Sequence, residues 1–325
     1  MTKKNTVLIL MGLATPFVLA LCLLLGAAGV GLPNLRTSGG QAIFTLRVTR
    51  VLAGFAVGAA LSCAGAVLQA LLRNPLAEPY VLGVSSGAGL GAALAIISGL
   101  AATAVLATPL CAFVSACLTL ATVYVLARIG GRLSIYSLIL SGIVVSSVAS
   151  SLLMFVISLS PVEGLHNVMW WMLGNLEVSS LPLLMVSAAL IFPGIMAIWL
   201  MAPELNALTL GQEMAHHVGV KTQTATTAGL LLATFVTAAS VATAGLIGFV
   251  GLIVPHTVRG LVGPDHRRLV PGCALAGGAF LAVCDAIART ALAPREIPVG
   301  VVTALIGGPF FMMVLYRQKR RDWVE

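Results

Sequence analysis

Charged residues are scarce in this chain of 325 residues, of which only 9% are Asp, Glu, Lys or Arg, against about 25% in an ordinary soluble protein. A soluble fold cannot cover its surface with so few charges. The 59% hydrophobic content excludes a disordered chain, and the 34 glycines lack the strict period of a collagen-like fibre. A polytopic membrane protein is the class that remains.

Motifs for catalysis and for nucleotide binding are also missing. The sequence contains no GxxxxGK[ST] phosphate loop and no HExxH, and its six cysteines form no CxxC pair. We therefore predict no catalytic residue, no metal site and no cofactor bound by this chain. The net charge of +8 does not indicate a nucleic-acid partner, because the basic residues lie in short loops and tails between apolar runs.

Apolar runs of the length that crosses a bilayer recur along the whole sequence. Few of them alternate as barrel strands would, so an all-α integral membrane protein is expected, with residues 1–325 as one polytopic domain. The eighth run is short and interrupted by Pro255, which leaves the count open by one. About ten transmembrane helices are predicted: Val7–Gly31, Val51–Leu72, Tyr80–Leu100, Thr103–Ala127, Ser134–Leu159, Leu181–Met201, Thr224–Ile247, Gly248–Val262, Leu269–Leu292 and Val299–Tyr316.

Basic residues predict the orientation of these segments. If the N-terminus lies inside, most Lys and Arg fall on the inner side, and the outer side carries only Arg36, Arg47, Arg50, Arg289 and Arg295. Both termini are therefore expected to be cytoplasmic. The longest hydrophilic loop, residues 202–223, then lies inside as well.

Four segments together form a distinctive pattern, and they occur in order along the chain. The chain resembles the FecCD-type permeases, which are the membrane subunits of bacterial ABC importers for iron–siderophores, haem and cobalamin. The resemblance runs from about residue 40 to the C-terminus. The segments that carry it are Arg47–Gly54 followed by Gly65–Pro79 and Leu82–Gly87; Leu210–Val220; Gly245–Arg259 followed by Gly263–Pro271; and Arg295–Phe311.

This resemblance implies a type II ABC importer permease in the bacterial inner membrane. A second permease copy, two cytoplasmic ABC ATPases that bind ATP and Mg, and a periplasmic or lipid-anchored binding protein are the implied partners, besides membrane lipid. The implied cargo is a metal chelate, with iron–siderophore favoured and cobalamin or haem open. The alternative is a stand-alone secondary transporter or channel, but only Asp285 is an acid within a span. Arg289, at i+4, can neutralise it.

Two arginines interrupt the positive-inside trend at the expected outer mouth of the second span. Arg47 and Arg50 are three residues apart, which places them on one helix face. They are either anchors that snorkel to the headgroups or a docking patch for an acidic partner. The resemblance implies docking of the binding protein by Arg47, Arg50 and Arg289.

The second and fifth spans carry the next candidates. Pro75 ends the helix after the second span and favours an extended Asn74, so this is either a tight turn or, as the resemblance implies, a cytoplasmic gate formed by Asn74, Pro75 and Leu76. The fifth span has small side chains within about one quadrant. They either pack closely with their hydroxyls bonded to the backbone or line the pathway: Ser134, Ser137, Ser141, Val148 and Ser151.

The cytoplasmic loop 202–223 contains a predicted short helix from Gly211 to Gly219. Gly219 suits a left-handed C-terminal cap, and Glu213 suits the helix N-terminus. The helix is either an ordinary surface helix or, as the resemblance implies, the element that docks into the ATPase through Gly211, Gln212, Glu213, Met214, His216 and Gly219. Trp170 and Trp171 are expected in an outer loop, as part of an interfacial aromatic belt.

Overall fold

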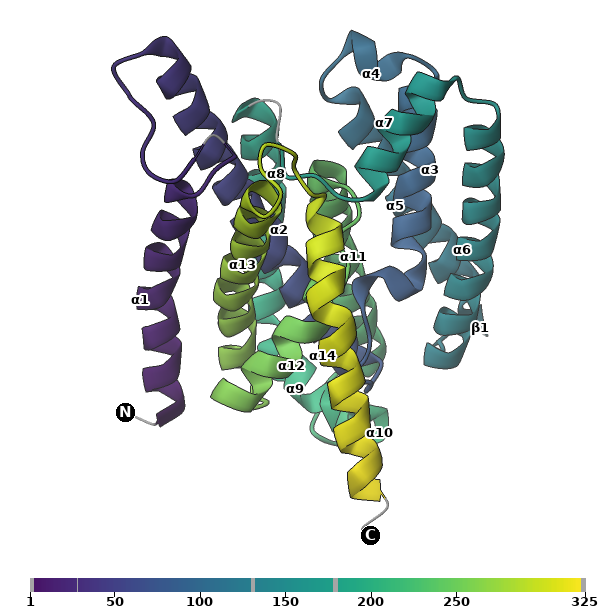
Figure 1. Ribbon diagram of the computed structural model, residues 1–325. Helices are drawn as coiled ribbons and strands as arrows, with labels where there is room; N and C mark the ends of the chain where they lie inside the picture. The colour runs from purple at the N-terminus through teal and green to yellow at the C-terminus, as the bar shows by residue number, and fades with distance from the viewer. Residues whose placement is uncertain (1–2, 28, 130–131, 178–180, 323–325) are drawn as a thin grey trace.

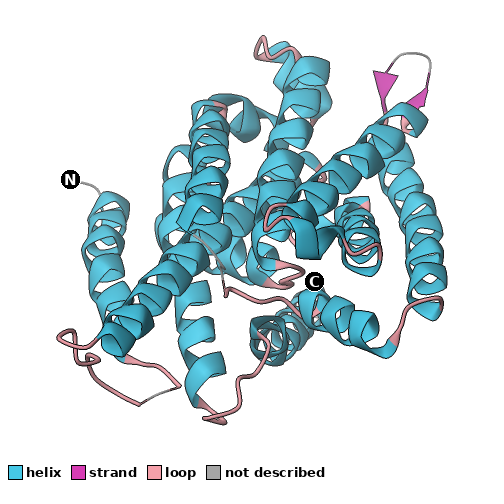
Figure 2. Cartoon of the chain, turned by 90° about the horizontal axis from the view of Figure 1, so that it is seen from above, coloured by secondary structure: helices cyan, strands magenta, loops and turns pink. Residues whose placement is uncertain are grey.

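The computed structural model describes residues 3–27, 29–129, 132–177 and 181–322. The described chain is a bundle of helices with one two-residue antiparallel ribbon, β1 (Arg128–Ile129) and β2 (Arg132–Leu133), at its periphery (Figures 1 and 2). The 3-10 helix η1 spans Pro79–Leu82. The helices are α1 (Lys3–Leu24), α2 (Ser38–Leu71), α3 (Val84–Ile97), α4 (Leu100–Thr103), α5 (Ala107–Leu126), α6 (Ile135–Ser158), α7 (Val162–Met172), α8 (Leu181–Leu200), α9 (Ala202–Thr209), α10 (Gln212–His217), α11 (Thr222–Ala244), α12 (Val250–Val262), α13 (His266–Thr290) and α14 (Val299–Asp322).

All ten predicted segments contain an apolar helix, but two of the helices are short. Eight described helices are long and apolar enough to cross a membrane, whereas α3 and α12 have only 14 and 13 residues. At about 1.5 Å per residue they span roughly 20 Å of a core about 30 Å thick. These two helices are therefore shorter than predicted, with α3 at Val84–Ile97 in place of Tyr80–Leu100 and α12 at Val250–Val262 in place of Gly248–Val262.

Irregular backbone precedes each short helix and explains its length. Residue 83 is left-handed (φ 82°) before α3, and Phe249 has φ 69° before α12, whereas Pro255 lies inside the continuous α12. The two irregular segments bond to each other. The hydroxyl of Tyr80 bonds to both the N–H and the carbonyl of Ile247 at 3.0 Å, and the carboxylate of Glu78 accepts from the N–H of Phe249. Such backbone is tolerated at membrane depth only when protein groups satisfy it.

The boundaries of three other segments also differ from the predictions. The first helix ends at Leu24 rather than at residue 31, and α2 begins at Ser38, thirteen residues before the predicted Val51. The predicted outer loop with Trp170 and Trp171 contains the helix α7. Hydropathy excluded the start of α2 because it contains two arginines, whose charges are compensated only in the folded chain.

Helix α2 forms the centre of the bundle and packs most extensively on α13. In its most apolar stretch 89% of the residues are buried, a larger share than in any other membrane-length helix of the described chain. A Cβ at Gly58 would overlap the carbonyl oxygen of Gly277 on α13, so glycine is required for this close approach. Lipid tails are as apolar as the helices, so the hydrophobic effect does not drive helices together within a membrane. Close packing of small residues contributes the attraction instead.

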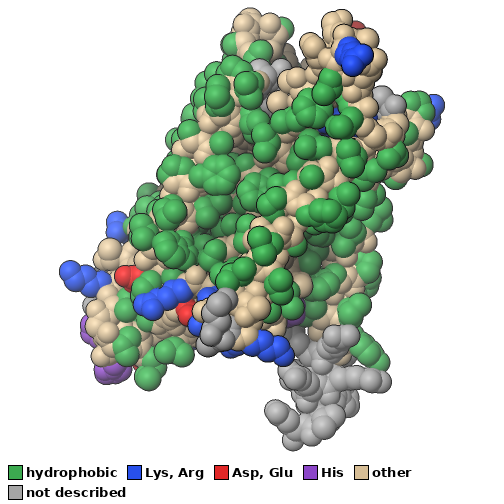
Figure 3. All heavy atoms as spheres, turned by 90° about the vertical axis from the view of Figure 1, so that its left-hand side faces the viewer, with side chains coloured by type: hydrophobic (Ala, Val, Ile, Leu, Met, Phe, Trp, Pro, Cys, Tyr) green, Lys and Arg blue, Asp and Glu red, His purple; other side chains and the backbone are tan. Residues whose placement is uncertain are grey.

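The outer surface fits a membrane environment. Hydrophobic side chains cover much of the face that carries α1, whereas Lys and Arg gather at the end of the molecule that carries the termini (Figure 3). Both ends of the chain lie at this end of the bundle, together with α10 (Figure 1). The arrangement matches the basic bias of the sequence, and we refer to this end as the inner end and to the opposite one as the outer end.

Candidate functional site

Three arginines at the outer end are buried rather than displayed. Arg47, Arg50 and Arg289 are 6%, 8% and 2% exposed. Arg47 donates from Nη1 to the carbonyl of Gly31 at 2.7 Å and from Nη2 to that of Gly29 at 3.0 Å. It therefore holds the linker that follows α1 against α2.

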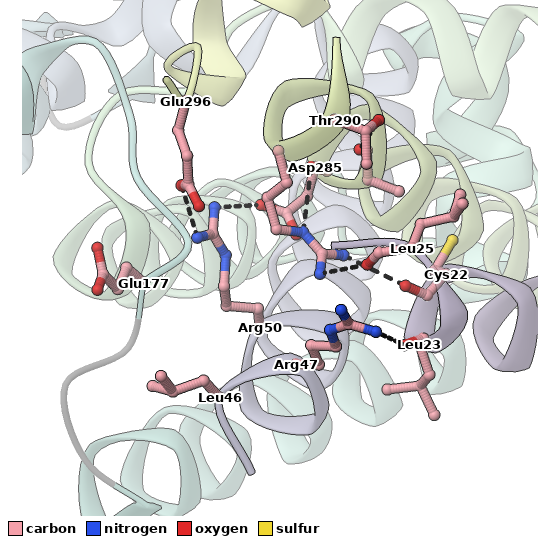
Figure 4. A network of polar contacts seen from close by, with 12 residues as sticks. Cys22, Leu23, Leu25, Leu46, Arg47, Arg50, Glu177, Asp285, Thr290 and Glu296 are labelled. Carbon is pink, nitrogen blue, oxygen red and sulfur yellow. Dashed lines mark hydrogen bonds and ion pairs between the residues drawn. The ribbon is translucent and has the colours of Figure 1, made fainter. Parts of the chain in front are cut away.

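The other two arginines converge on one buried carboxylate. Asp285 is fully buried and accepts from Nη2 of Arg50 at 3.0 Å, and its second oxygen lies 2.9 Å from Nε of Arg289. Arg50 also contacts Glu296 at 2.7 Å, so it lies between two acids, as Figure 4 shows. Arg289 donates to the carbonyl of Leu25 at 3.0 Å. The predicted pairing of Asp285 with Arg289 is confirmed.

Arg47 and Arg50 were predicted at the outer mouth of the second span, but both are buried within α2. Arg47 and Arg50 lie inside α2 and turn to different partners: Arg47 to the linker after α1, and Arg50 to α13 and the loop that follows it. The two arginines border a cavity of about 180 Å³ together with Glu177 and Glu296. The acids offset the desolvation of Arg50 and Arg289, and backbone carbonyls satisfy Arg47, so the network joins α1, α2 and α13. The predicted docking role stays a prediction.

The inner turn after α2 has the tight geometry that Pro75 favours. The side chain of Asn74 accepts from the N–H of Leu76 at 2.9 Å, and its carbonyl accepts from Ala77 at 3.1 Å. Asn74 and Pro75 are exposed at the inner end, and Leu76 is half-buried. The turn is thus built from local bonds, and the gate that Asn74, Pro75 and Leu76 are predicted to form remains a prediction.

Arg73 occupies a left-handed position (φ 48°) directly before this turn, where glycine is the usual residue. The N–H of Asn74 bonds to the carbonyl of Gln69 at 3.2 Å, which is the bond that closes a left-handed helix end. We expect Arg73→Gly to stabilise the chain by about 1 kcal/mol, because it removes the steric cost of this conformation. The midpoint of thermal unfolding in detergent measures it.

Arg73→Ala serves as the control for this change. It removes the same guanidinium but retains the Cβ, so it should leave the midpoint close to that of the unchanged chain. Equal stabilisation by both variants would show that the side chain, rather than the backbone conformation, is the unfavourable element.

An inner cavity brings three predicted groups together. It encloses about 690 Å³ and is bordered by Arg73 at the end of α2, by residues 133–136 at the start of α6, and by residues 210–214 around the start of α10. A Cβ built on Gly211, which has φ 108°, would lie 3.3 Å from Nη1 of Arg73. The turn, the predicted pathway helix and the predicted coupling helix therefore share one cavity wall.

The short helix in the inner loop has the predicted form. Gly211 precedes α10, and Gly219 has φ 85°, with its N–H bonded to the carbonyl of His216 at 2.9 Å. Its left-handed cap is confirmed. Gln212, Glu213, His216 and His217 are exposed, and the apolar side chains of Leu210, Met214 and Val218 are 66%, 54% and 63% exposed. Met214 lies within α10, and Leu210 and Val218 flank its two ends; we call these three exposed side chains the apolar ridge of α10.

The loop that carries α10 is fastened to the bundle through α9. Asn206 of α9 donates to Asp265 at 2.8 Å and accepts from the N–H of His266 at 2.8 Å. Burial raises the pKa of Asp265, but the hydrogen bonds from Asn206 and Arg267 and the charges of Arg268 and Arg267 outweigh it and lower the pKa. Asp265 therefore stays ionised and caps α13, and Asn206 connects α9 to the start of α13. The sequence contained no signal for Asn206.

Helix α6 presents an exposed face to its surroundings. Ser134 caps the helix from outside and accepts from the N–H of Ser137 at 3.4 Å, so the span begins one residue later than predicted. Ser137 and Ser141 are half-buried, Val148 is 56% exposed, and Ser151 is exposed and bonds to the carbonyl of Ser147 at 2.9 Å. Ser151 thus satisfies its hydroxyl within the helix, and pore lining by this stripe stays a prediction.

A cavity of about 410 Å³ at the outer end was not predicted. It lies between α7, α4 and the end of α11, and Asn167, Trp170, Trp171 and Asn175 border it. The only sequence signal was the aromatic pair itself, which an interfacial belt explained equally well. Within the described residues, no group of three or more His, Cys, Asp or Glu side chains could hold a metal ion.

These features define a multi-span helical membrane protein whose inner end carries an exposed short helix. A family model, the FecCD transport family, matches residues 6–317, and the chain belongs to this family.

Named relatives and a solved structure agree with this assignment. The chain is 43% identical to the cobalamin import system permease protein BtuC of Halobacterium salinarum, over 83% of this chain and 72% of that protein. It is 37% identical to the hemin transport system permease protein HmuU of Yersinia pestis, over 94% and 95%. A solved inward-facing structure of a metal-chelate type ABC transporter matches with a TM-score of 0.88 and 30% identity, covering 96% of this chain and 99% of that one. The predicted type II importer fold is thereby confirmed.

Proposed function

We propose that this chain is the membrane subunit of an ABC importer that carries a metal chelate inwards across the bacterial inner membrane. The observation that carries the proposal is α10, a capped helix with an exposed apolar ridge at the inner end of a FecCD-family bundle. The cargoes named for two relatives are cobalamin and hemin, both large metal macrocycles. Metal macrocycles and iron–siderophores are therefore the cargo classes to test first.

The implied partners follow from two surfaces of the chain. A second permease copy is proposed to face α6, whose Tyr136, Ile143 and Phe155 are 77%, 54% and 61% exposed. Two cytoplasmic ATPases, which would bind ATP and Mg, are proposed to receive the ridge of α10. In this arrangement the cavity shared by Arg73, Ser134 and Gly211 connects ATPase movement to the inner turn.

A periplasmic or lipid-anchored binding protein is proposed to dock at the outer end. Glu296, whose side chain is 36% exposed, already pairs with Arg50, so an acidic residue of the partner would compete with it. Replacing Arg47, Arg50 and Arg289 by Glu would not test docking alone. Three acids in place of three buried, paired arginines would also destabilise the outer end.

ATP dependence separates this function from that of a stand-alone carrier. Because the sequence contains no phosphate loop, the purified chain alone is expected to show no ATPase activity, and uptake in liposomes should require the cognate ATPase and ATP. The measurement is chelate uptake with and without that subunit. Uptake by the chain alone, driven by an ion gradient, would establish the secondary transporter instead.

A further inference from the structure

A groove between α5 and α11 is separate from the outer and inner sites. It encloses about 480 Å³ and is bordered by residues between Cys117 and Val125 of α5 and between Leu231 and Phe235 of α11. Its surface is almost entirely apolar, and Leu231 and Val125 are 47% and 68% exposed. Nothing in the proposed transport function uses it.

The depth of the groove corresponds to a single membrane leaflet. Helix α5 ends at Leu126, beside the ribbon at the inner end, and the groove begins at Val125. From Val125 to Cys117 the helix rises about 12 Å. The inner half of the hydrocarbon core is about 15 Å thick. An acyl chain of the inner leaflet would therefore lie beside these residues.

A fixed cation stands at the inner mouth of this groove. Arg128 follows α5 by two residues and is exposed, and its guanidinium carbon lies 4.8 Å from the ring centroid of Tyr124, which borders the groove. A guanidinium stacked on an aromatic ring keeps its donors free for a phosphate. The ribbon that begins with Arg128 packs against α11 through β2. Segments attached to both α5 and α11 therefore meet at the inner mouth of the groove.

A buried hydroxyl in the groove wall also lacks a partner. Thr234 is 2% exposed, and its Oγ1 has no hydrogen-bond partner in the part of the chain that the structure describes. By contrast, Thr237, Ser240 and Thr243 of the same helix each donate to the carbonyl four residues earlier at 2.7 Å. Thr234 lies about 18 Å along α11 from Thr222, so it marks the deep end of the groove, beside the end of an acyl chain rather than beside its headgroup.

We propose that the groove binds one anionic phospholipid of the inner leaflet. Its acyl chain lies along α5 and α11, and its phosphate contacts Arg128. An inner-leaflet lipid combines a tail at this depth with a negative headgroup at this mouth, whereas a soluble ligand would lack the tail. The assignment of the lipid to the inner leaflet follows from the excess of basic residues at the inner end and does not depend on which cargo the chain carries.

Lipid titration of the full-length chain in detergent tests this proposal. We expect phosphatidylglycerol to raise the midpoint of thermal unfolding at lower concentrations than phosphatidylcholine does. Arg128→Gln should raise the half-saturating phosphatidylglycerol concentration about five-fold, as expected for the loss of one basic contact. It should leave the response to phosphatidylcholine unchanged. Leu231→Trp, which fills the groove, should weaken the response to both lipids.

Two control variants and a second measurement keep the result interpretable. Lys221→Gln removes an inner basic residue at the start of α11, and Leu110→Trp enlarges an exposed residue of α5 outside the groove. Both should respond to lipid as the unchanged chain does. Native mass spectrometry should show less bound phosphatidylglycerol for Arg128→Gln than for Lys221→Gln.

Three results would overturn the proposal. The first is an equal response to the two lipids in the unchanged chain. The second is unaltered binding by Arg128→Gln and by Leu231→Trp. The third is conversion of a dimer to monomers by Leu231→Trp, because the groove would then hold a second copy of this chain rather than a lipid.

Discussion

Replacing Gly219 by valine is expected to reduce ATP-coupled uptake about ten-fold while the membrane helices remain folded. Gly219 has φ 85°, and no described atom lies within 4 Å of a Cβ built on it. The cost is therefore backbone strain, roughly 1–2 kcal/mol, which lowers the population of the correctly placed α10 about ten-fold. Uptake by proteoliposomes that contain the cognate ATPase measures the effect, and this expectation rests on the proposed function.

Two variants distinguish the effect of backbone strain at Gly219 from the effect of the same strain elsewhere and from the loss of the glycine alone. Gly99→Val introduces the same strain at an equally open glycine (φ 79°) at the outer end, before α4, and should preserve stimulation of the ATPase by the loaded binding protein. Gly219→Asn should retain most uptake, because asparagine tolerates the left-handed region. Normal uptake by Gly219→Val would assign α10 to an ordinary surface loop.

Asp285→Asn is expected to cost about 3–5 kcal/mol of folding stability. The carboxylate is fully buried and lies 3.0 Å from Arg50 and 2.9 Å from Arg289, so the change leaves the buried Arg289 without its counter-charge and Arg50 with Glu296 alone. The buried thiols of Cys22 and Cys284 adjoin this network and report its opening. Their reaction with a thiol-specific dye should begin at a lower temperature in the variant.

Glu296→Gln is the matched control for that experiment. It removes the other acidic partner of Arg50, but the side chain of Glu296 is 36% exposed, so the expected loss is at most about 1 kcal/mol. If the two variants open at the same temperature, the burial of Asp285 adds nothing to the stability that its ion pairs contribute. The network would then be no stronger than a surface pair.

Features that depend on neighbouring residues were predictable from the sequence. The apolar runs predicted the helices, the Asn74–Pro75 pair predicted a turn, and Gly219 predicted a left-handed cap. The pairing of Asp285 with Arg289 needed only a spacing of four on one helix. In each case the partners lie within a few residues, so local geometry determined the result whatever the rest of the chain did.

Features that depend on distant residues were decided by the tertiary structure. The thirteen residues by which α2 exceeds its prediction contain Arg47 and Arg50, which hydropathy places outside a span. They are accommodated because Arg47 bonds carbonyls 16 and 18 residues away, and Arg50 meets Asp285, 235 residues later. The short α3 and α12 likewise depend on bonds between Tyr80 and Ile247. A buried charge or an irregular backbone is favourable only beside its partner, and folding alone brings such partners together.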